Sequence, residues 1–203
     1  MRFTDGLDHG PWPNDMLISV IDDASTLLLL LFVRSAWRLD DNGVPPLECA
    51  PDAGSTRAPA GLDRAEANAR WVADWARAFE VVAPPRRITS GPDAAMQRLL
   101  DAGASVEELL GATSPEPFWR TGLDVEAEWA WRRSLQRDPR EGSLSPEHDA
   151  VEWLVPVWRS GLRTIIELPY AGYYVKRVDV ERVVVSAATR HDPELYSIAL
   201  STL

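Results

Sequence analysis

The 203-residue sequence predicts an α+β fold, in which a mostly helical first three quarters packs on a small antiparallel sheet near the C-terminus, followed by a terminal helix. Segments with apolar residues at helical spacing and with capping residues recur up to residue 161. In contrast, β-branched and aromatic residues concentrate between residues 163 and 190. The length and the 45% hydrophobic content suit a single domain that spans residues 1–203.

The first strong element is a run of seven large apolar residues, Leu27 to Val33, for which we expect a helix over residues 24–39. Leucine favours helix over strand, and five consecutive leucines cover most of the circumference, so this helix should be buried on nearly all sides. Three residues offer N-caps at its start: Asp22, Asp23 and Ser25. The shorter apolar segment 16–21 predicts a strand.

The same run bears on localisation. A membrane-spanning helix needs about 20 apolar residues, far more than this run contains. A signal peptide begins with positive charge, whereas five aspartates and one arginine precede the run. Cys49 is the only cysteine, which leaves no intrachain disulfide and suits a reducing compartment. We therefore expect a cytoplasmic protein that makes no contact with a membrane.

Residues 40–61 form the clearest loop, because they are rich in Pro, Gly and Ala. A stretch of this length without secondary structure is usually a linker, a lid or a binding loop. Beyond it, three helices have clear N-cap signals, at Asp63, Asp124 and Ser145. In the third helix, residues 145–161, we expect Pro156 to cause a kink or a break and Gly161 to mark the end. Residues 90–114 predict two further short helices.

Three segments near the C-terminus predict strands: RTIIEL, YYVKRVD and ERVVVSAATR, at residues 163–168, 173–179 and 181–190. The PYAG sequence at 169–172 separates the first two and predicts a hairpin turn. The three strands should therefore pair in chain order, as an antiparallel meander. Asp192 and Pro193 have the spacing of an N-cap and a first helical residue for the terminal helix.

No catalytic or cofactor motif stands out in the chain. Gly-rich phosphate loops, the GxSxG elbow and the HExxH pair do not occur, so we expect no cofactor and assign no catalytic residue. A His-Asp dipeptide occurs at His148 and again at His191. Phosphohydrolases of the HD type bind metal through such a dipeptide, but His9, the only upstream histidine, lies far from any predicted helix. We therefore interpret both dipeptides as helix caps and expect no metal.

Carboxylates cluster on two of the predicted helices. One helix carries Glu126 and Glu128, and the helix that follows Ser145 carries Glu147, Asp149 and Glu152. Paired carboxylates can act as general acids only where burial or a neighbour perturbs them. Periodicity does not indicate burial here, so we expect both clusters to lie on solvated faces.

Two aromatic segments are candidates for binding. SPEPFWRTG places Phe118 and Trp119 beside prolines, and PYAGYY places Tyr170, Tyr173 and Tyr174 around a turn. Aromatic residues in loops favour recognition surfaces, because they bring contact area with little loss of entropy. The alternative is that these side chains fold back over the core.

The net charge of −10 and the pI of about 4.8 argue against nucleic acid and membrane surfaces as partners, since both are anionic. We expect a non-catalytic protein-interaction module, adaptor-like or immunity-like, with an acidic surface and a basic protein partner. The alternative is a small-molecule-binding protein or hydrolase-like enzyme, with a pocket between helices and sheet that the 40–61 loop covers. A third hypothesis is a homodimer formed through the C-terminal strands.

Overall fold

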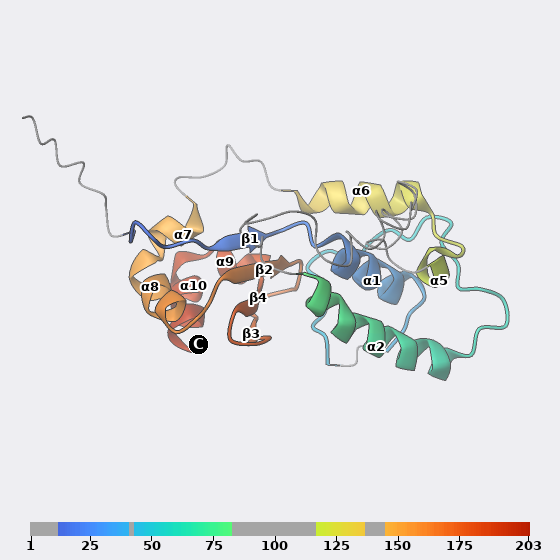
Figure 1. Cartoon of the computed structure of the whole chain (residues 1–203). Coiled ribbons are helices and arrows are strands. Elements are labelled where there is room, and N and C mark those ends of the chain that lie inside the picture. The colour runs from blue at the N-terminus through green and yellow to red at the C-terminus, as the bar shows by residue number, and fades with distance from the viewer. Residues whose placement is uncertain (1–11, 41–42, 83–116, 137–144) are drawn as a thin grey trace, which may run out of the picture. The chain divides into compact units, whose positions relative to one another are not determined.

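The computed structural model describes residues 12–40, 43–82, 117–136 and 145–203, which contain eight helices and a four-stranded mixed sheet (Figure 1). The chain divides into two compact units. Among the described residues, the sheet unit comprises 12–22, 46–49 and 145–203, and the helical unit comprises the remainder. The α+β class and the terminal helix are confirmed. The two short helices predicted within residues 90–114 lie outside the described residues, and the single domain stays a prediction.

The sheet has the strand order β1-β2-β4-β3 and is mostly parallel. Its strands are β1 Ser19–Ile21, β2 Thr164–Leu168, β3 Val175–Arg177 and β4 Arg182–Ser186. Strand β2 pairs in parallel with both β1 and β4, and only β3 runs antiparallel to its neighbour β4. The predicted antiparallel meander is therefore wrong. Strands β2 and β4 carry nearly continuous buried β-branched residues, as expected for central parallel strands.

The predicted hairpin and the end of the last strand also differ from the structure. PYAG does not join neighbouring strands, since β4 lies between β2 and β3, and Tyr170 instead forms an isolated bridge with Leu47. The strand predicted to reach residue 190 ends at Ser186. The Ser186 side chain accepts a hydrogen bond from the backbone of Thr189 and so caps the short helix α9, Ala187–Arg190.

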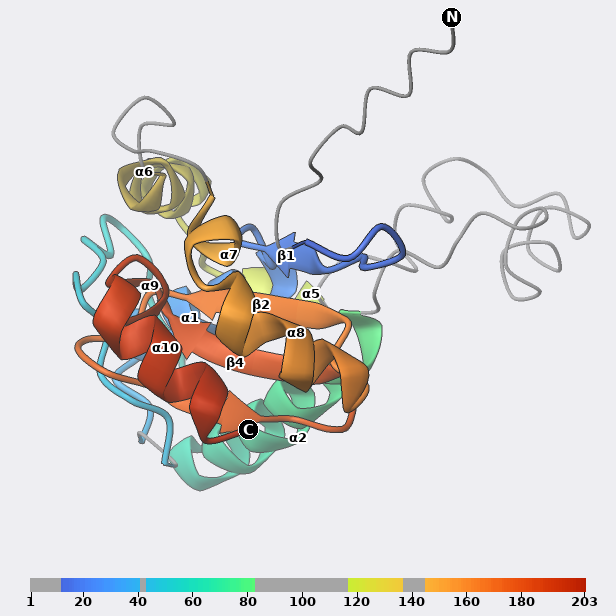
Figure 2. The same ribbon diagram turned by 90° about the vertical axis from the view of Figure 1, so that its left-hand side faces the viewer.

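Three more helices complete the sheet unit: α7 Pro146–Asp149, α8 Val151–Arg159 and α10 Pro193–Ser201. Helices α8 and α10 lie across one face of the sheet (Figure 2), where Leu154 and Leu200 share a buried core with Ile165 and Val183. Of the kink or break predicted at Pro156, the break is wrong, since helix α8 passes through this residue and the interruption lies at Ala150. The kink stays a prediction.

The helical unit contains α1 Ser25–Ala36, α2 Arg64–Val81, α5 Pro117–Arg120 and α6 Val125–Leu135. The apolar run is confirmed as a buried helix, since the side chains from Leu27 to Val33 are at most 3% exposed. Asp63 and Asp124 cap α2 and α6 as predicted. No side chain caps α1, whose N-cap position is Ala24, so the predicted caps at its start are wrong. The described residues of the 40–61 loop contain no helix.

Candidate functional site

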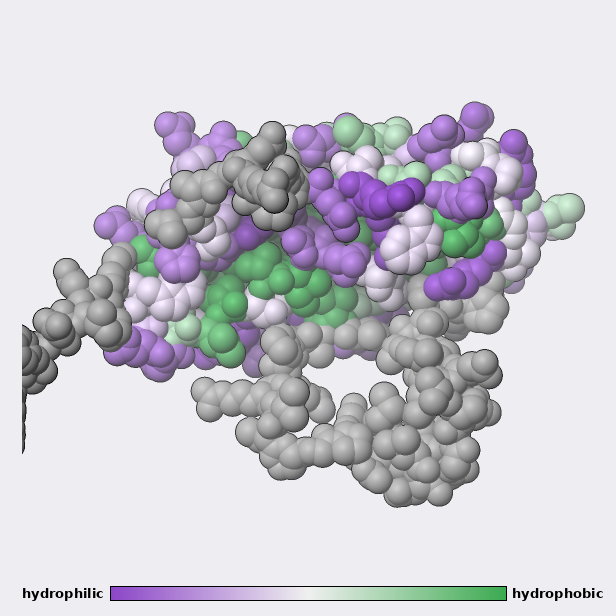
Figure 3. All heavy atoms as spheres, turned by 90° about the horizontal axis from the view of Figure 1, so that it is seen from above, coloured by the Kyte–Doolittle hydropathy of each residue, from purple (hydrophilic) through white to green (hydrophobic). Residues whose placement is uncertain are grey.

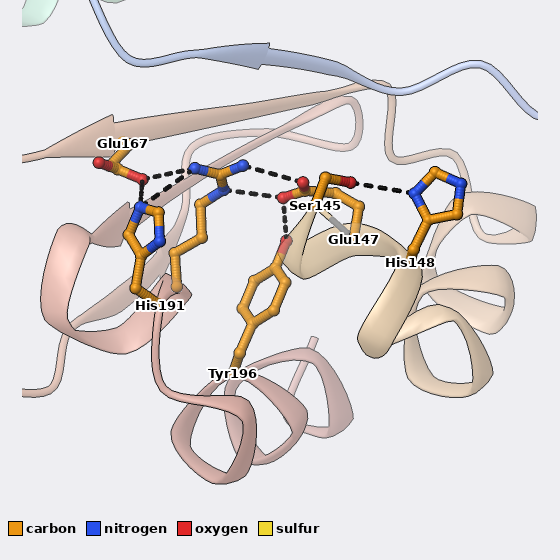
Figure 4. A network of polar contacts seen from close by, with 7 residues as sticks. Ser145, Glu147, His148, Glu167, His191 and Tyr196 are labelled. Atoms are coloured by element: carbon orange, nitrogen blue, oxygen red, sulfur yellow. Dashed lines mark hydrogen bonds and ion pairs between the residues drawn. The ribbon is translucent and has the colours of Figure 1, made fainter. Parts of the chain in front are cut away.

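A buried network of charged side chains joins four elements of the sheet unit (Figure 4). Arg190, the last residue of α9, donates from Nε and Nη2 to the two carboxylate oxygens of Glu147 on α7, at 2.7 and 2.8 Å. Its Nη1 donates to Glu167 Oε2 on β2, at 2.8 Å. Tyr196 on α10 donates its hydroxyl hydrogen to Glu147 Oε1 at 3.2 Å, and His191 Nε2 lies 3.2 Å from Glu167 Oε2. One guanidinium thus holds two carboxylates.

Glu147 lies on α7, just before the interruption at Ala150, and keeps the spacing of the buried residues of α8. Glu147, Val151 and Leu154 occupy positions i, i+4 and i+7, and all three are buried. The expectation of a solvated face is therefore wrong for Glu147, and it is also wrong for Glu128 on α6, which is 4% exposed and pairs with Arg132. The spacing of Glu147 from Val151 and Leu154 indicates from the sequence that the three residues share a face, but not which partner covers that face.

The network keeps its groups in their paired, charged states. Burial disfavours the charged form of Glu147, but the hydrogen bonds and the charge of Arg190 outweigh that effect and hold the pKa of Glu147 below its ordinary value. Burial also opposes the charged form of Arg190, yet Glu147 and Glu167 raise the pKa of this guanidinium. Burial and the negative charge of Glu147 raise the pKa of Tyr196, which therefore stays a neutral donor.

The Glu167 and His191 side of the network lies nearest to solvent, and Figure 4 shows these two side chains on the side opposite Glu147. The His191 side chain is 31% exposed and that of Glu167 is 13% exposed. Glu167 stands near the carboxyl end of β2, and in parallel sheets this edge is where ligands commonly bind. A histidine oriented by a carboxylate has the arrangement of a general base. Both oxygens of Glu147 and the Oε2 of Glu167 are already engaged within the network.

The second histidine of the sheet unit makes a local contact. His148 Nδ1 lies 3.0 Å from Ser145 Oγ, at the start of α7, and its ring stacks on Trp12. A catalytic serine–histidine pair needs a third group that orients the histidine, and no carboxylate is seen bonded to His148 among the described residues. Asp192 caps α10 as predicted, through the backbone N–H groups of Glu194 and Leu195. The described part of the chain contains no group of three or more His, Cys, Asp or Glu side chains that could hold a metal ion.

The five aromatic residues predicted as a binding set do not share one environment. Tyr170 is 2% exposed, Tyr174 is half-buried against it, and Tyr173 is 45% exposed, all in the sheet unit. In the helical unit, Trp119 is 1% exposed and its Nε1 donates to Asp74 Oδ2 at 2.8 Å, while Phe118 is half-buried beside it. The burial of Trp119 and Tyr170 has the character of core packing, and a binding role of this set stays a prediction.

No family model, curated protein or solved structure matches this chain. Among the described residues, no helix combines the length and the hydrophobicity needed to cross a membrane.

Proposed function

We propose that this protein is a non-catalytic interaction module, adaptor-like or immunity-like, that binds a protein partner with a basic contact surface. The closed charge network supports the non-catalytic part of this proposal. Its buried carboxylate, Glu147, has both oxygens bound by Arg190 and Tyr196, so substrate could reach it only by breaking those bonds. Such a network fixes α7, α9 and α10 to the sheet and leaves recognition to the surface.

The observation that carries the proposal is an exposed tryptophan on α6. Trp129 is 57% exposed, and Val125, one turn earlier on the same helix, is 49% exposed. Tryptophan is among the residues that contribute most binding energy at protein interfaces, because it buries a large area and keeps a polar N–H. We define the Val125 and Trp129 side chains as the α6 patch.

Negative charge next to the α6 patch favours a basic partner. Glu126 is exposed between the two patch residues, and Asp124 caps the same helix. Hydrogen bonds from Ser55 and Ala127 lower the pKa of Asp124 to about 2, so this carboxylate stays charged at neutral pH. Together with the net charge of −10, these groups should steer a cationic surface toward α6.

The test compares two exposed tryptophans. The bait proteins are the wild type, Trp129→Ala on α6 and Trp153→Ala on α8, where Trp153 is 48% exposed. Figure 3 shows that hydrophobic side chains also reach the surface elsewhere, between hydrophilic ones, so an exposed control of the same residue type is needed. We expect the wild type and Trp153→Ala to capture a basic protein that Trp129→Ala does not capture. Added salt should release this protein from the bait. Capture that is indifferent to Trp129 and to salt would overturn the proposal. Light scattering of the free protein tests the homodimer hypothesis separately.

The contact between His191 and Glu167 supports the alternative of a hydrolase-like enzyme. Its test is a screen of esterase and phosphatase substrates with the wild type and His191→Gln. Turnover that the substitution abolishes, with folding unchanged by circular dichroism, would favour the enzyme over the interaction module.

A further inference from the structure

The helical unit contains a hollow of about 540 Å³ between the C-terminal end of α1 and residues 51–58 of the loop. The hollow is open to solvent, and both Arg38 and Arg57 in its lining are exposed. Among the described residues, the charged members of its lining are Arg38 and Arg57, and none is acidic. Ser35 and Thr56 also belong to the lining, and Thr56 is 1% exposed. In a chain with a net charge of −10, a hollow whose charged lining residues, within the described ranges, are both arginines is unexpected.

Arg38 occupies a backbone conformation that normally selects glycine. Its φ is +53°, and it is the one non-glycine residue with positive φ in the described ranges. Its N–H donates to Ser35 O and the following N–H, of Leu39, donates to Arg34 O, which is the hydrogen-bond pattern of a Schellman helix end. An L-residue in this position is strained, whereas glycine is not. Strained backbone positions of this kind cluster at ligand-binding and active sites.

Arg57 is held in place by its surroundings. Its Nη1 donates to Gly54 O at 3.2 Å and to Thr56 O at 2.7 Å, and its backbone N–H donates to Gly122 O at 3.0 Å. Thr56 Oγ1 in turn accepts a hydrogen bond from the backbone N–H of Asp124. Those bonds leave Nε and Nη2 of Arg57 for other acceptors. In the described residues, no ion pair involves Arg38 or Arg57, in contrast to Arg132 and Arg190.

We propose that this hollow binds a small molecule through a phosphate group. Two guanidiniums supply the charge that a phosphate dianion requires, and their planar N–H groups match its oxygens. The proposal assigns a ligand-binding role to residues 51–58 of the loop.

The experiment measures binding of inorganic phosphate by calorimetry at constant ionic strength, with citrate as a second probe. The variants are Arg38→Gly and Arg57→Ala, and the matched control is Arg133→Ala, an exposed arginine of α6 outside the lining. We expect phosphate to bind the wild type and Arg133→Ala equally, and both lining variants on the order of ten-fold more weakly, as expected for loss of a charge-assisted hydrogen bond.

Arg38→Gly keeps the test independent of folding. Because glycine relieves the strain, its thermal midpoint in phosphate-free buffer should be higher than that of the wild type while its affinity for phosphate falls. Equal phosphate affinity in the wild type and Arg38→Gly would overturn the proposal. Binding of citrate alone, or no saturable binding of phosphate by the wild type, would overturn it as well.

Discussion

Arg190 donates two parallel hydrogen bonds to Glu147, from Nε to Oε1 at 2.7 Å and from Nη2 to Oε2 at 2.8 Å. The two residues lie 43 positions apart in the chain, and each is less than 10% exposed. The pair joins α7 to the end of α9, and Glu167 extends it to the sheet. Each buried charge is compensated by its hydrogen-bonded partner. Removal of either partner would leave an uncompensated charge in the interior, which is strongly destabilising.

Substitution of Arg190 by Met should lower the free energy of unfolding by about 3–5 kcal/mol, because Glu147 and Glu167 would lose their cation in a buried site. Urea unfolding followed by tryptophan fluorescence measures the loss. Arg159→Met, at an exposed position of α8, is the control and should change stability by no more than about 0.5 kcal/mol. Equal effects of the two substitutions would contradict a structural role of the network.

The free energy of unfolding should fall at acidic pH, because protonation of Glu147 removes its charge from the ion pair with Arg190. Its folded-state pKa is lower than its ordinary value of 4.5, so the stabilisation is present above pH 4.5 and is lost as the pH falls through the folded-state pKa. Urea unfolding at a series of pH values should show a weaker acid dependence for Glu147→Gln than for the wild type. Asp124 causes a further loss of stability between pH 3.8 and about 2, and this loss should also occur in Glu147→Gln. Identical pH slopes for both proteins would contradict the assignment to Glu147.

Two glycines of the helical unit provide a matched test of packing. Gly54 and Gly43 both have positive φ, so alanine at either site carries backbone strain of roughly 1–2 kcal/mol. A Cβ at Gly54 would lie 2.6 Å from Asp124 Oδ2 and 2.9 Å from Ala127 Cβ, whereas one at Gly43 would meet nothing within 4 Å. Gly54→Ala should therefore be the more destabilising, by about a further 1–3 kcal/mol, in chemical denaturation. A larger loss for Gly43→Ala would show that the contact with α6 is looser than described.

Trp119 should prove to be a stability residue. Its side chain is 1% exposed and donates to Asp74, so Trp119→Ala should cost about 3–5 kcal/mol of unfolding free energy. Trp129→Ala, at a position that is 57% exposed, should change stability by about 0.5 kcal/mol or less. Thermal unfolding of the two variants measures both effects. If Trp119→Ala were as stable as the wild type, Trp119 would not be needed for packing, and its role in a recognition surface would be favoured.

Much of the local structure could be predicted because it depends on residues a few positions apart. The N-caps at Asp63, Asp124 and Asp192 each bond to backbone groups within three residues, so their spacing indicates the helix start directly. Strand order could not be predicted in the same way. The segments with the strongest β propensity are β2 and β4, but the parallel pairing of β2 with β4 on one side and with β1 on the other depends on contacts far apart in the chain.

The sequence by itself determined that the run from Leu27 to Val33 is a buried helix, because seven consecutive apolar residues leave no polar face to expose. Only the tertiary structure decided that Glu147 is buried and Trp129 exposed. Helical spacing indicates which residues share a face, but the partner that covers the face sets its environment. For Glu147 that partner is Arg190, which a short turn of helix after β4 brings back to α7.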